Sequence, residues 1–190
     1  DAISYAPTGA NAGTVTEDGL NTSFNLTNVG GLTIDAAAGT DQVTVLGNVS
    51  GNTIGVVRGA NTSVTVDALQ AADIVSGNTE HLLISAGLGN DTTNVSGTGG
   101  PELTIDGGGT PGDALSITNT TAGTTVVNPG LTSDSGTVNT PDAANNTAFV
   151  GIESILLTGA AATDDLVIFG TTDADTISLV LNFATVNDRA

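Results

Sequence analysis

The chain has 190 residues, and 20 acidic residues against two Arg give it a formal net charge of −18 at pH 7. It contains no Cys, Met, Trp or Lys, which excludes disulfide bonds, thiol catalysis, Cys-based zinc sites and lysine chemistry. Nucleic-acid binding needs a basic surface, which this composition cannot supply. An anionic membrane surface would repel the chain, and no window of about 18 apolar residues predicts membrane insertion.

Apolar residues alternate with Thr and Ser in short segments along the chain, which predicts β-strands. No segment has a convincing helical period, so we expect few helices. Aromatic residues make up only 3% of the sequence, so the core should be thin and built from Val, Ile and Leu. In chain order, the alternating segments contain Leu32 and Ile34, Val43 and Val45, Val64 and Val66, Leu103 and Ile105, Leu115 and Ile117, and Ile177, Leu179 and Leu181.

The sequence also repeats itself. Residues 32–35 recur identically as residues 103–106, and Glu80 aligns with Glu153 at an offset of 73. We therefore expect residues 1–190 to form one β-repeat array with an internal duplication, residues 32–97 and 103–170. Residues 1–5 resemble residues 113–117 and residues 170–179 begin a further unit, so we expect partial repeats at both ends of a segment of a longer array. An eroded two-copy protein is the alternative.

Four small-residue turns, each ending in Asp, separate strands within the units. The turn aspartates are spaced 50, 22 and 51 residues apart, which fits a step of about 22–25 residues taken once or twice. Such a step favours an all-β parallel β-helix, or β-solenoid, of about eight coils whose inward aliphatic residues stack on one another. Tandem β-sandwich domains are the alternative. The four residues are Asp41, Asp91, Asp113 and Asp164.

Two segments resemble a known family. Residues 86–91, Ala-Gly-Leu-Gly-Asn-Asp, are close to the calcium-binding nonapeptide of β-rolls, and residues 151–159 read Gly-Ile-Glu-Ser-Ile-Leu-Leu-Thr-Gly. The chain resembles the RTX-like (haemolysin-type) Gly/Asp/Thr-rich repeat proteins that bacteria secrete. The resemblance implies an extracellular location at the bacterial cell surface, a solenoid-like fold and Ca²⁺ sites. The chain departs from the family because its turns are not in tandem, Ala replaces Gly at 36–38 and 160–162, and Thr93 takes an apolar position.

The acidic turns are the candidate metal sites. Ca²⁺ takes six to eight oxygen ligands, and divalent cations would relieve the mutual repulsion of the carboxylates. The alternatives are that Asp and Asn bond their own turns and that salt screens the charge. Asp91 and Asp113 are the best pair because they lie a single coil step apart. The full set of candidate ligands is Asp91, Asp113, Asn90, Asp41, Asp164, Asp165, Asp173 and Asp175.

Enzymatic residues are not expected, and neither is a bound organic cofactor. Glu80 and Glu153 should accept hydrogen bonds at strand ends, and about three coils would separate them too far for a glycosidase pair. His81 is the only His and should be exposed on a strand. Arg58 and Arg189 are too few to bind an acidic sugar.

The sequence therefore predicts a structural module rather than an enzyme. The favoured function is a repeat module of a secreted bacterial surface protein, such as a filament, a surface layer or an adhesin stalk, stabilised by calcium. Its partners would be other copies or repeats of itself, joined head to tail through unpaired sheet edges. A glycan- or surface-binding adhesin module is the second hypothesis, and a β-helix polysaccharide-active enzyme is the third.

Overall fold

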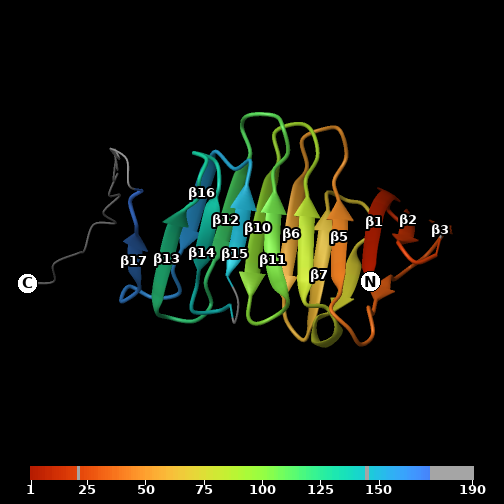
Figure 1. The fold of residues 1–190 in the computed structure, drawn as a ribbon, viewed down its shortest axis with the longest axis horizontal. Coiled ribbons are helices and arrows are strands. Elements are labelled where there is room, and N and C mark those ends of the chain that lie inside the picture. The colour runs from red at the N-terminus through yellow and green to blue at the C-terminus, as the bar shows by residue number, and fades with distance from the viewer. Residues whose placement is uncertain (21, 144–145, 172–190) are drawn as a thin grey trace, which may run out of the picture.

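The computed structural model describes residues 1–20, 22–143 and 146–171. In these residues the protein is all-β apart from one turn of 3-10 helix, Ser76–Asn78, which confirms the all-β part of the predicted fold class. The described strands form a ten-stranded and a seven-stranded mixed sheet. Figure 1 shows the strands side by side along the long axis, with β3 at one end and β17 at the other. No helix in the described ranges is long and apolar enough to cross a membrane.

The ten-stranded sheet has the order β17-β13-β14-β15-β11-β9-β5-β1-β2-β3. Its strands are β1 (Ala2–Gly9), β2 (Ala12–Glu17), β3 (Ser23–Thr27), β5 (Gln42–Leu46), β9 (His81–Ser85), β11 (Glu102–Asp106), β13 (Thr124–Pro129), β14 (Gly136–Asn139), β15 (Thr147–Val150) and β17 (Asp165–Ile168).

The seven-stranded sheet has the order β16-β12-β10-β6-β7-β8-β4. Its strands are β4 (Thr33–Ile34), β6 (Thr53–Arg58), β7 (Asn61–Val66), β8 (Ala72–Val75), β10 (Thr92–Gly97), β12 (Ala114–Thr118) and β16 (Ser154–Thr158).

Each sheet contains a run of adjacent parallel strands. These are β1, β5, β9, β11 and β15 in the ten-stranded sheet and β6, β10, β12 and β16 in the seven-stranded sheet. The chain crosses from one sheet to the other between β5 and β6, β9 and β10, β11 and β12, and β15 and β16. We call each such pair of strands a rung.

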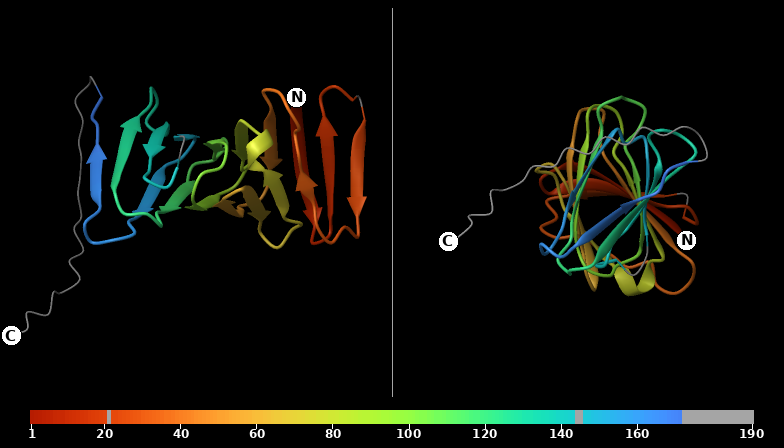
Figure 2. Two further views of the ribbon diagram at one scale, coloured as in Figure 1. Left: turned by 90° about the horizontal axis from the view of Figure 1, so that it is seen from below. Right: turned by 90° about the vertical axis from the view of Figure 1, so that its left-hand side faces the viewer.

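The parallel register lines up apolar residues from successive rungs. Val43 pairs with Leu82, and Leu82 with Leu103, so the same face of three strands is aliphatic. Side chains of the two inner faces form one core. Figure 2 shows the stacked strands from below and end-on. Full burial of an aliphatic side chain stabilises the fold by about 1.5–3 kcal/mol. The largest fully buried residues are Tyr5, Ile54, Ile74, Leu82, Ile84, Leu103, Ile105, Leu115, Val43, Val45, Val56 and Val64.

The strand order of the first unit recurs in the second unit with the sheets exchanged. Strands β10-β6-β7-β8-β4 are adjacent in the seven-stranded sheet, and β17-β13-β14-β15-β11 have the same order in the ten-stranded sheet. The parallel and antiparallel pairs also correspond, as for β4 with β8 and β11 with β15. The identical segments 32–35 and 103–106 therefore lie in opposite sheets.

The number of residues between stacked strands varies. Leu82 and Leu103, paired between β9 and β11, are 21 residues apart. Val43 and Leu82 are 39 residues apart, because the antiparallel strands β7 and β8 are inserted after β6. Inserted β13 and β14 likewise separate Leu103 from Thr147 by 44 residues.

Candidate functional site: the acidic turns

An acidic residue immediately precedes β10, β12 and β16 in the seven-stranded sheet. Each of these side chains accepts a hydrogen bond from the backbone of the preceding rung. Asn52 N–H donates to Asp91 Oδ1 at 2.6 Å, Asp91 N–H to Asp113 Oδ1 at 2.7 Å, and Asp113 N–H to Glu153 Oε2 at 2.7 Å. Hydrogen bonds to carboxylates are stronger than neutral ones. This column of side chains therefore joins successive rungs beside the backbone ladder.

The ten-stranded sheet repeats this arrangement. Asp41 N–H, before β5, donates to Glu80 Oε2 at 2.7 Å, and Gly123 N–H, before β13, donates to Asp164 Oδ1 at 2.8 Å. The prediction that Glu80 and Glu153 accept hydrogen bonds at strand ends is confirmed. The Asp1 amino group also contacts Asp41 Oδ1 at 2.6 Å.

The turns that precede Asp91 and Asp113 stack closely through glycine. Gly87 and Gly108 have φ values of +104° and +101°, which L side chains rarely adopt. A Cβ on Gly87 would overlap the Asn48 carbonyl oxygen, and a Cβ on Gly108 would overlap the Gly87 carbonyl oxygen. Glycine at these two positions lets the backbone of one turn lie directly on the next.

Three buried turn carboxylates each have one oxygen without a hydrogen-bond partner in the described structure. Asp41, Asp91 and Asp113 are 2%, 2% and 0% exposed, and their Oδ2 atoms are unpaired. Burying such an oxygen without a partner is unfavourable. Two of these residues, Asp91 and Asp113, are the pair that the sequence favoured as calcium ligands, and the hydrogen bond from Asp91 N–H to Asp113 brings them into adjacent rungs.

Burial raises the pKa of both residues of this pair. For Asp91 the hydrogen bond from Asn52 offsets part of the effect of burial, while the charge of Asp113 raises the pKa further. For Asp113 the hydrogen bond from Asp91 acts against burial, and the charge of Glu153 adds to it. A nearby cation would favour the charged form of both carboxylates.

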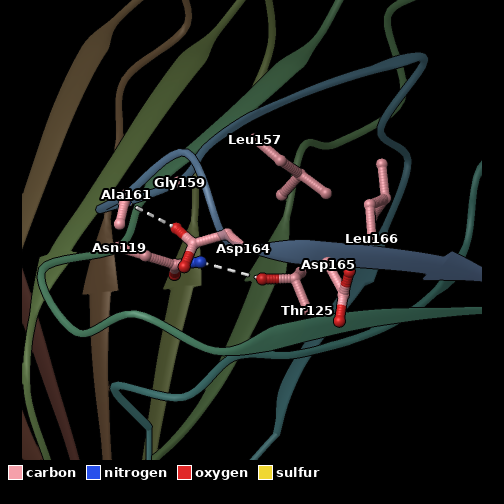
Figure 3. A pocket seen from close by; sticks show the side chains of 8 residues that line it. All are labelled: Asn119, Thr125, Leu157, Gly159, Ala161, Asp164, Asp165 and Leu166. Atoms are coloured by element: carbon pink, nitrogen blue, oxygen red, sulfur yellow. Dashed lines mark hydrogen bonds between the residues drawn. The ribbon is translucent and has the colours of Figure 1, made fainter.

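Asp164 and Asn52 also lie directly before a strand, but each of their side-chain oxygens accepts a hydrogen bond. Asp164 Oδ2 accepts from Ala161 N–H at 2.9 Å (Figure 3), and hydrogen bonds from Ala161 and Gly123 lower the pKa of Asp164. Asn52 accepts from Asn48 N–H at 3.0 Å and donates to Asp67. These two turns satisfy their own polar groups, which distinguishes them from the Asp91 and Asp113 turns.

The remaining predicted ligands are dispersed. Asn90 is exposed beside Asp91, with its side chain against Gly112. Asp165 is exposed and lines a hollow with Asp164 (Figure 3). The hollow is next to β17, which is at the opposite end of the ten-stranded sheet from β3. Asp173 and Asp175 lie outside the described residues.

Sequence reasoning missed one acidic cluster. Carboxylate oxygens of Asp1, Glu17 and Asp18 lie within 4.8 Å of one another, the sole group of three potential metal ligands in the part of the chain that the structure describes. Consecutive acidic residues at 17 and 18 were its only sequence signal.

Sequence reasoning also missed the position of Arg58, which is 6% exposed at the end of β6. Its Nη2 donates to the Pro101 carbonyl at 2.8 Å and its Nη1 to Thr147 Oγ1 at 3.3 Å. The guanidinium thus links the seven-stranded sheet to Pro101, directly before β11, and to β15. Burial lowers the pKa of Arg58. The alternation Ile54, Val56, Arg58 could have predicted an inward side chain.

Asp142 accepts three hydrogen bonds from two neighbouring threonines. Its Oδ1 accepts from Thr121 N–H at 2.7 Å, and its Oδ2 accepts from the N–H and hydroxyl of Thr120. Burial by itself raises the pKa of Asp142, but the hydrogen bonds from Thr121 and Thr120 outweigh it, so the pKa is lowered. Its stabilising contribution is therefore present above the ordinary value of 3.8 and is lost as the pH falls through the folded-state pKa.

Replacing Asp142 by Ala should lower the free energy of unfolding by about 1.5–3 kcal/mol at pH 7, because the Thr120 and Thr121 donors lose a charged acceptor. Urea unfolding at pH 7 and pH 3 measures the effect, and the difference from wild type should shrink at pH 3. Asp73→Ala removes an exposed carboxylate and serves as the control, with a change below about 0.5 kcal/mol. A loss equal at both pH values would contradict the assigned role of the carboxylate.

Comparison of the chain with protein-family models, with curated proteins and with solved structures finds no match.

Proposed function

We propose that the chain is a structural repeat module of a secreted bacterial surface protein, built as a β-solenoid stack of rungs. The observation that carries this proposal is the recurrence of one strand order in opposite sheets. A half-turn about the long axis combined with a shift along it would relate the two units in this way. Repetition by such an operation extends without limit and suits a filament, a surface layer or a stalk.

Pairing across the boundary of the units supports the solenoid over tandem sandwiches. Strand β9 of the first unit pairs with β11 of the second, and β10 pairs with β12. Separate sandwich domains would each complete their own sheets. In the solenoid, the uninterrupted run of parallel strands in the ten-stranded sheet has five members in the described residues. This is fewer than the predicted eight or so coils, because antiparallel strands take up part of the chain.

The stack is suited to bearing load along its axis. Backbone hydrogen bonds, the carboxylate columns and the aliphatic core all connect one rung to the next. Strands β3 and β17 end one sheet, and β4 and β16 end the other. Such edges pair readily with further strands, so the partner that we propose is another repeat or copy of the chain, joined head to tail.

The two other hypotheses have less support. A flat binding face would favour a glycan- or surface-binding adhesin, but one outward row of the seven-stranded sheet runs Gly55, Asn94, Ser116 and Leu156, which is chemically irregular. An enzyme acting on acidic polysaccharide would need available cations, whereas Arg58 is buried. His81 is exposed, as predicted, and its Nδ1 lies 3.0 Å from Glu102 Oε2.

Analytical ultracentrifugation and electron microscopy of the purified chain test the assembly. We expect concentration-dependent rods that lengthen by end-to-end addition. Dispersed globular particles that stay monomeric at all concentrations would overturn the head-to-tail proposal.

Calcium is the cation that we propose for the Asp91 and Asp113 turns. Their two unpaired, buried carboxylate oxygens fit a site for a hard cation. Turn carbonyls would have to complete the six to eight ligands, because no third acidic group joins this pair within the described chain. When bound, Ca²⁺ would neutralise two carboxylates that burial otherwise disfavours.

Thermal melting with Ca²⁺ and with EGTA tests this site. Ca²⁺ at a hundredfold excess over its dissociation constant should raise the melting temperature of wild type by about 5–10 °C. Asp113→Asn should abolish most of the rise, whereas Asp73→Asn, which removes an equal charge from an exposed position, should preserve it. An unchanged wild-type melting temperature would remove calcium from the proposal.

A further inference from the structure

A meander of three antiparallel strands recurs along the described chain, as β1-β2-β3, β6-β7-β8 and β13-β14-β15. The first strand of each meander has a parallel neighbour, which is β5, β10 and β17 in turn. The third strand also has a parallel neighbour in two meanders, since β4 lies beside β8 and β11 beside β15. The third strand of the first meander, β3, is the edge of the ten-stranded sheet (Figure 1). Among the described strands, this meander therefore lacks its last neighbour.

The two strands that fill this place elsewhere share one sequence. Strand β4 lies within the first copy of Leu-Thr-Ile-Asp, and β11 contains the second. Their registers also agree, because the Ile of each copy faces an apolar residue of the third strand: Ile34 lies opposite Ile74, and Ile105 opposite Phe149. The place beside the third strand is thus matched to one short segment of sequence.

The register of the meanders identifies the corresponding residues of β3. In each meander a Val of the middle strand faces one residue of the first strand and one of the third. These residues are Val15 with Tyr5 and Phe24, Val64 with Val56 and Ala72, and Val138 with Val127 and Thr147. Phe24 therefore corresponds to Ala72 and Thr147. Two positions further on, Leu26 corresponds to Ile74.

Phe24 is exposed although it belongs to the inner face of the sheet. Its partner Val15 also pairs with Tyr5, which is fully buried, and paired residues of neighbouring strands point to the same side. Phe24 is 49% exposed, whereas the corresponding Ala72 and Thr147 are 0% and 1% exposed. An exposed inward Phe on an edge strand is suited to being covered by one more strand.

We propose that the edge of β3 binds a parallel strand of the Leu-Thr-Ile-Asp type, contributed by a further repeat that stacks on this end of the molecule. The Leu of the added strand lies opposite Phe24, its Thr opposite Asn25 and its Ile opposite Leu26. Asn25 N–H donates to the carbonyl of that Leu, as Asp73 N–H donates to the Leu32 carbonyl at 2.9 Å. Such strand addition takes its affinity from main-chain hydrogen bonds and its specificity from alternate side chains. This inference rests on the proposed head-to-tail stack and specifies the strand that the stack adds at β3.

A disulfide between β3 and a synthetic peptide tests this register. Because the chain has no Cys, the variant Asn25→Cys carries a single thiol, at an exposed position. The first peptide has the sequence of residues 99–107 with Cys in place of Thr104. The control peptide has Cys in place of Glu102, one outward position out of register. In the proposed pairing, the first Cys is about 4.8 Å from residue 25 and the control Cys is about 8 Å away, so only the first is within the Cα separation that a disulfide spans.

The Asn25→Cys thiol is first converted to a mixed disulfide with thionitrobenzoate, and the release of thionitrobenzoate by each peptide is followed by absorbance. The first peptide should react at least about tenfold faster than the control peptide. A third peptide, with Cys in place of Thr104 and Ser in place of Leu103 and Ile105, should react as slowly as the control. Equal rates for the three peptides would overturn the proposal.

Two charge variants test which face of β3 covers the added side chains. In the Asn25→Cys background, Phe24→Asp should remove the preference for the first peptide, whereas Ser23→Asp, on the opposite face of the strand, should retain it. Both positions are exposed, so circular dichroism should show the folded chain in each case. Equal loss in the two variants would contradict the inward position of Phe24.

These outcomes are separable from the assembly test. A chain that stays monomeric yet prefers the first peptide would refute head-to-tail joining of copies and keep the strand-binding edge. Rods whose β3 still accepts the peptide at the rate of the monomer would keep the assembly and overturn the assignment of this edge to it.

Discussion

Replacing Gly108 by Ala is expected to lower the free energy of unfolding by about 3–4 kcal/mol, measured by urea or guanidinium denaturation. Gly108 has a φ of +101° and no room for a side chain, because a Cβ would meet the carbonyl oxygen of Gly87 in the adjacent turn. Strained backbone and overlap between two main chains both contribute to the cost. The two turns can separate only by breaking the contact between their rungs.

Gly109→Ala is the matched control in the same turn. A Cβ on Gly109 would meet no atom within 4 Å, and its φ is outside the left-handed region. We expect a change within about 0.5 kcal/mol of wild type. A loss at Gly108 as small as that at Gly109 would show that the turns do not stack as described, and the solenoid proposal would lose a principal support.

The inward residues of the core were predictable, and the reason is local. Alternation places Val43 and Val45, or Leu103 and Ile105, on one face of a strand whatever the strand pairs with. These residues are buried, and the all-β prediction is confirmed. Alternation carries no information on which sheet a strand joins or whether its neighbour is parallel. The antiparallel insertions and the exchange of sheets between the units were therefore not predicted.

The acidic turns were likewise predictable only in part. Their residues were found from composition and spacing, and the proximity of Asp91 and Asp113 followed from one short step along the chain. The difference between an Asp with an unpaired oxygen and one such as Asp164, whose oxygens both accept hydrogen bonds, depends on where the turn N–H groups point. The turns before Asp41 and Asp164 both contain alanines, yet only Asp41 has an unpaired oxygen, so residue composition does not predict the difference.

Ile105→Ala and Ile34→Ala compare the same tetrapeptide, Leu-Thr-Ile-Asp, in two environments. Ile105 is fully buried in β11 and pairs with Ile84 on one side and Phe149 on the other. Ile34 is 5% exposed in the two-residue strand β4, which has β8 as its one neighbour. A cavity in the middle of a sheet cannot collapse as freely as one at its edge.

We therefore expect Ile105→Ala to cost about 3–4 kcal/mol and Ile34→Ala about 2 kcal/mol in chemical denaturation. Thr104→Ala, on the outward face of β11, controls for the loss of a β-branched residue and should cost below about 1 kcal/mol. Equal losses at the two isoleucines would mean that local sequence alone sets the stability of each copy. A larger loss at Ile105 would show that the stability of this segment depends on the rungs stacked on both sides of it, so that the middle of the array holds its strands more firmly than the ends do.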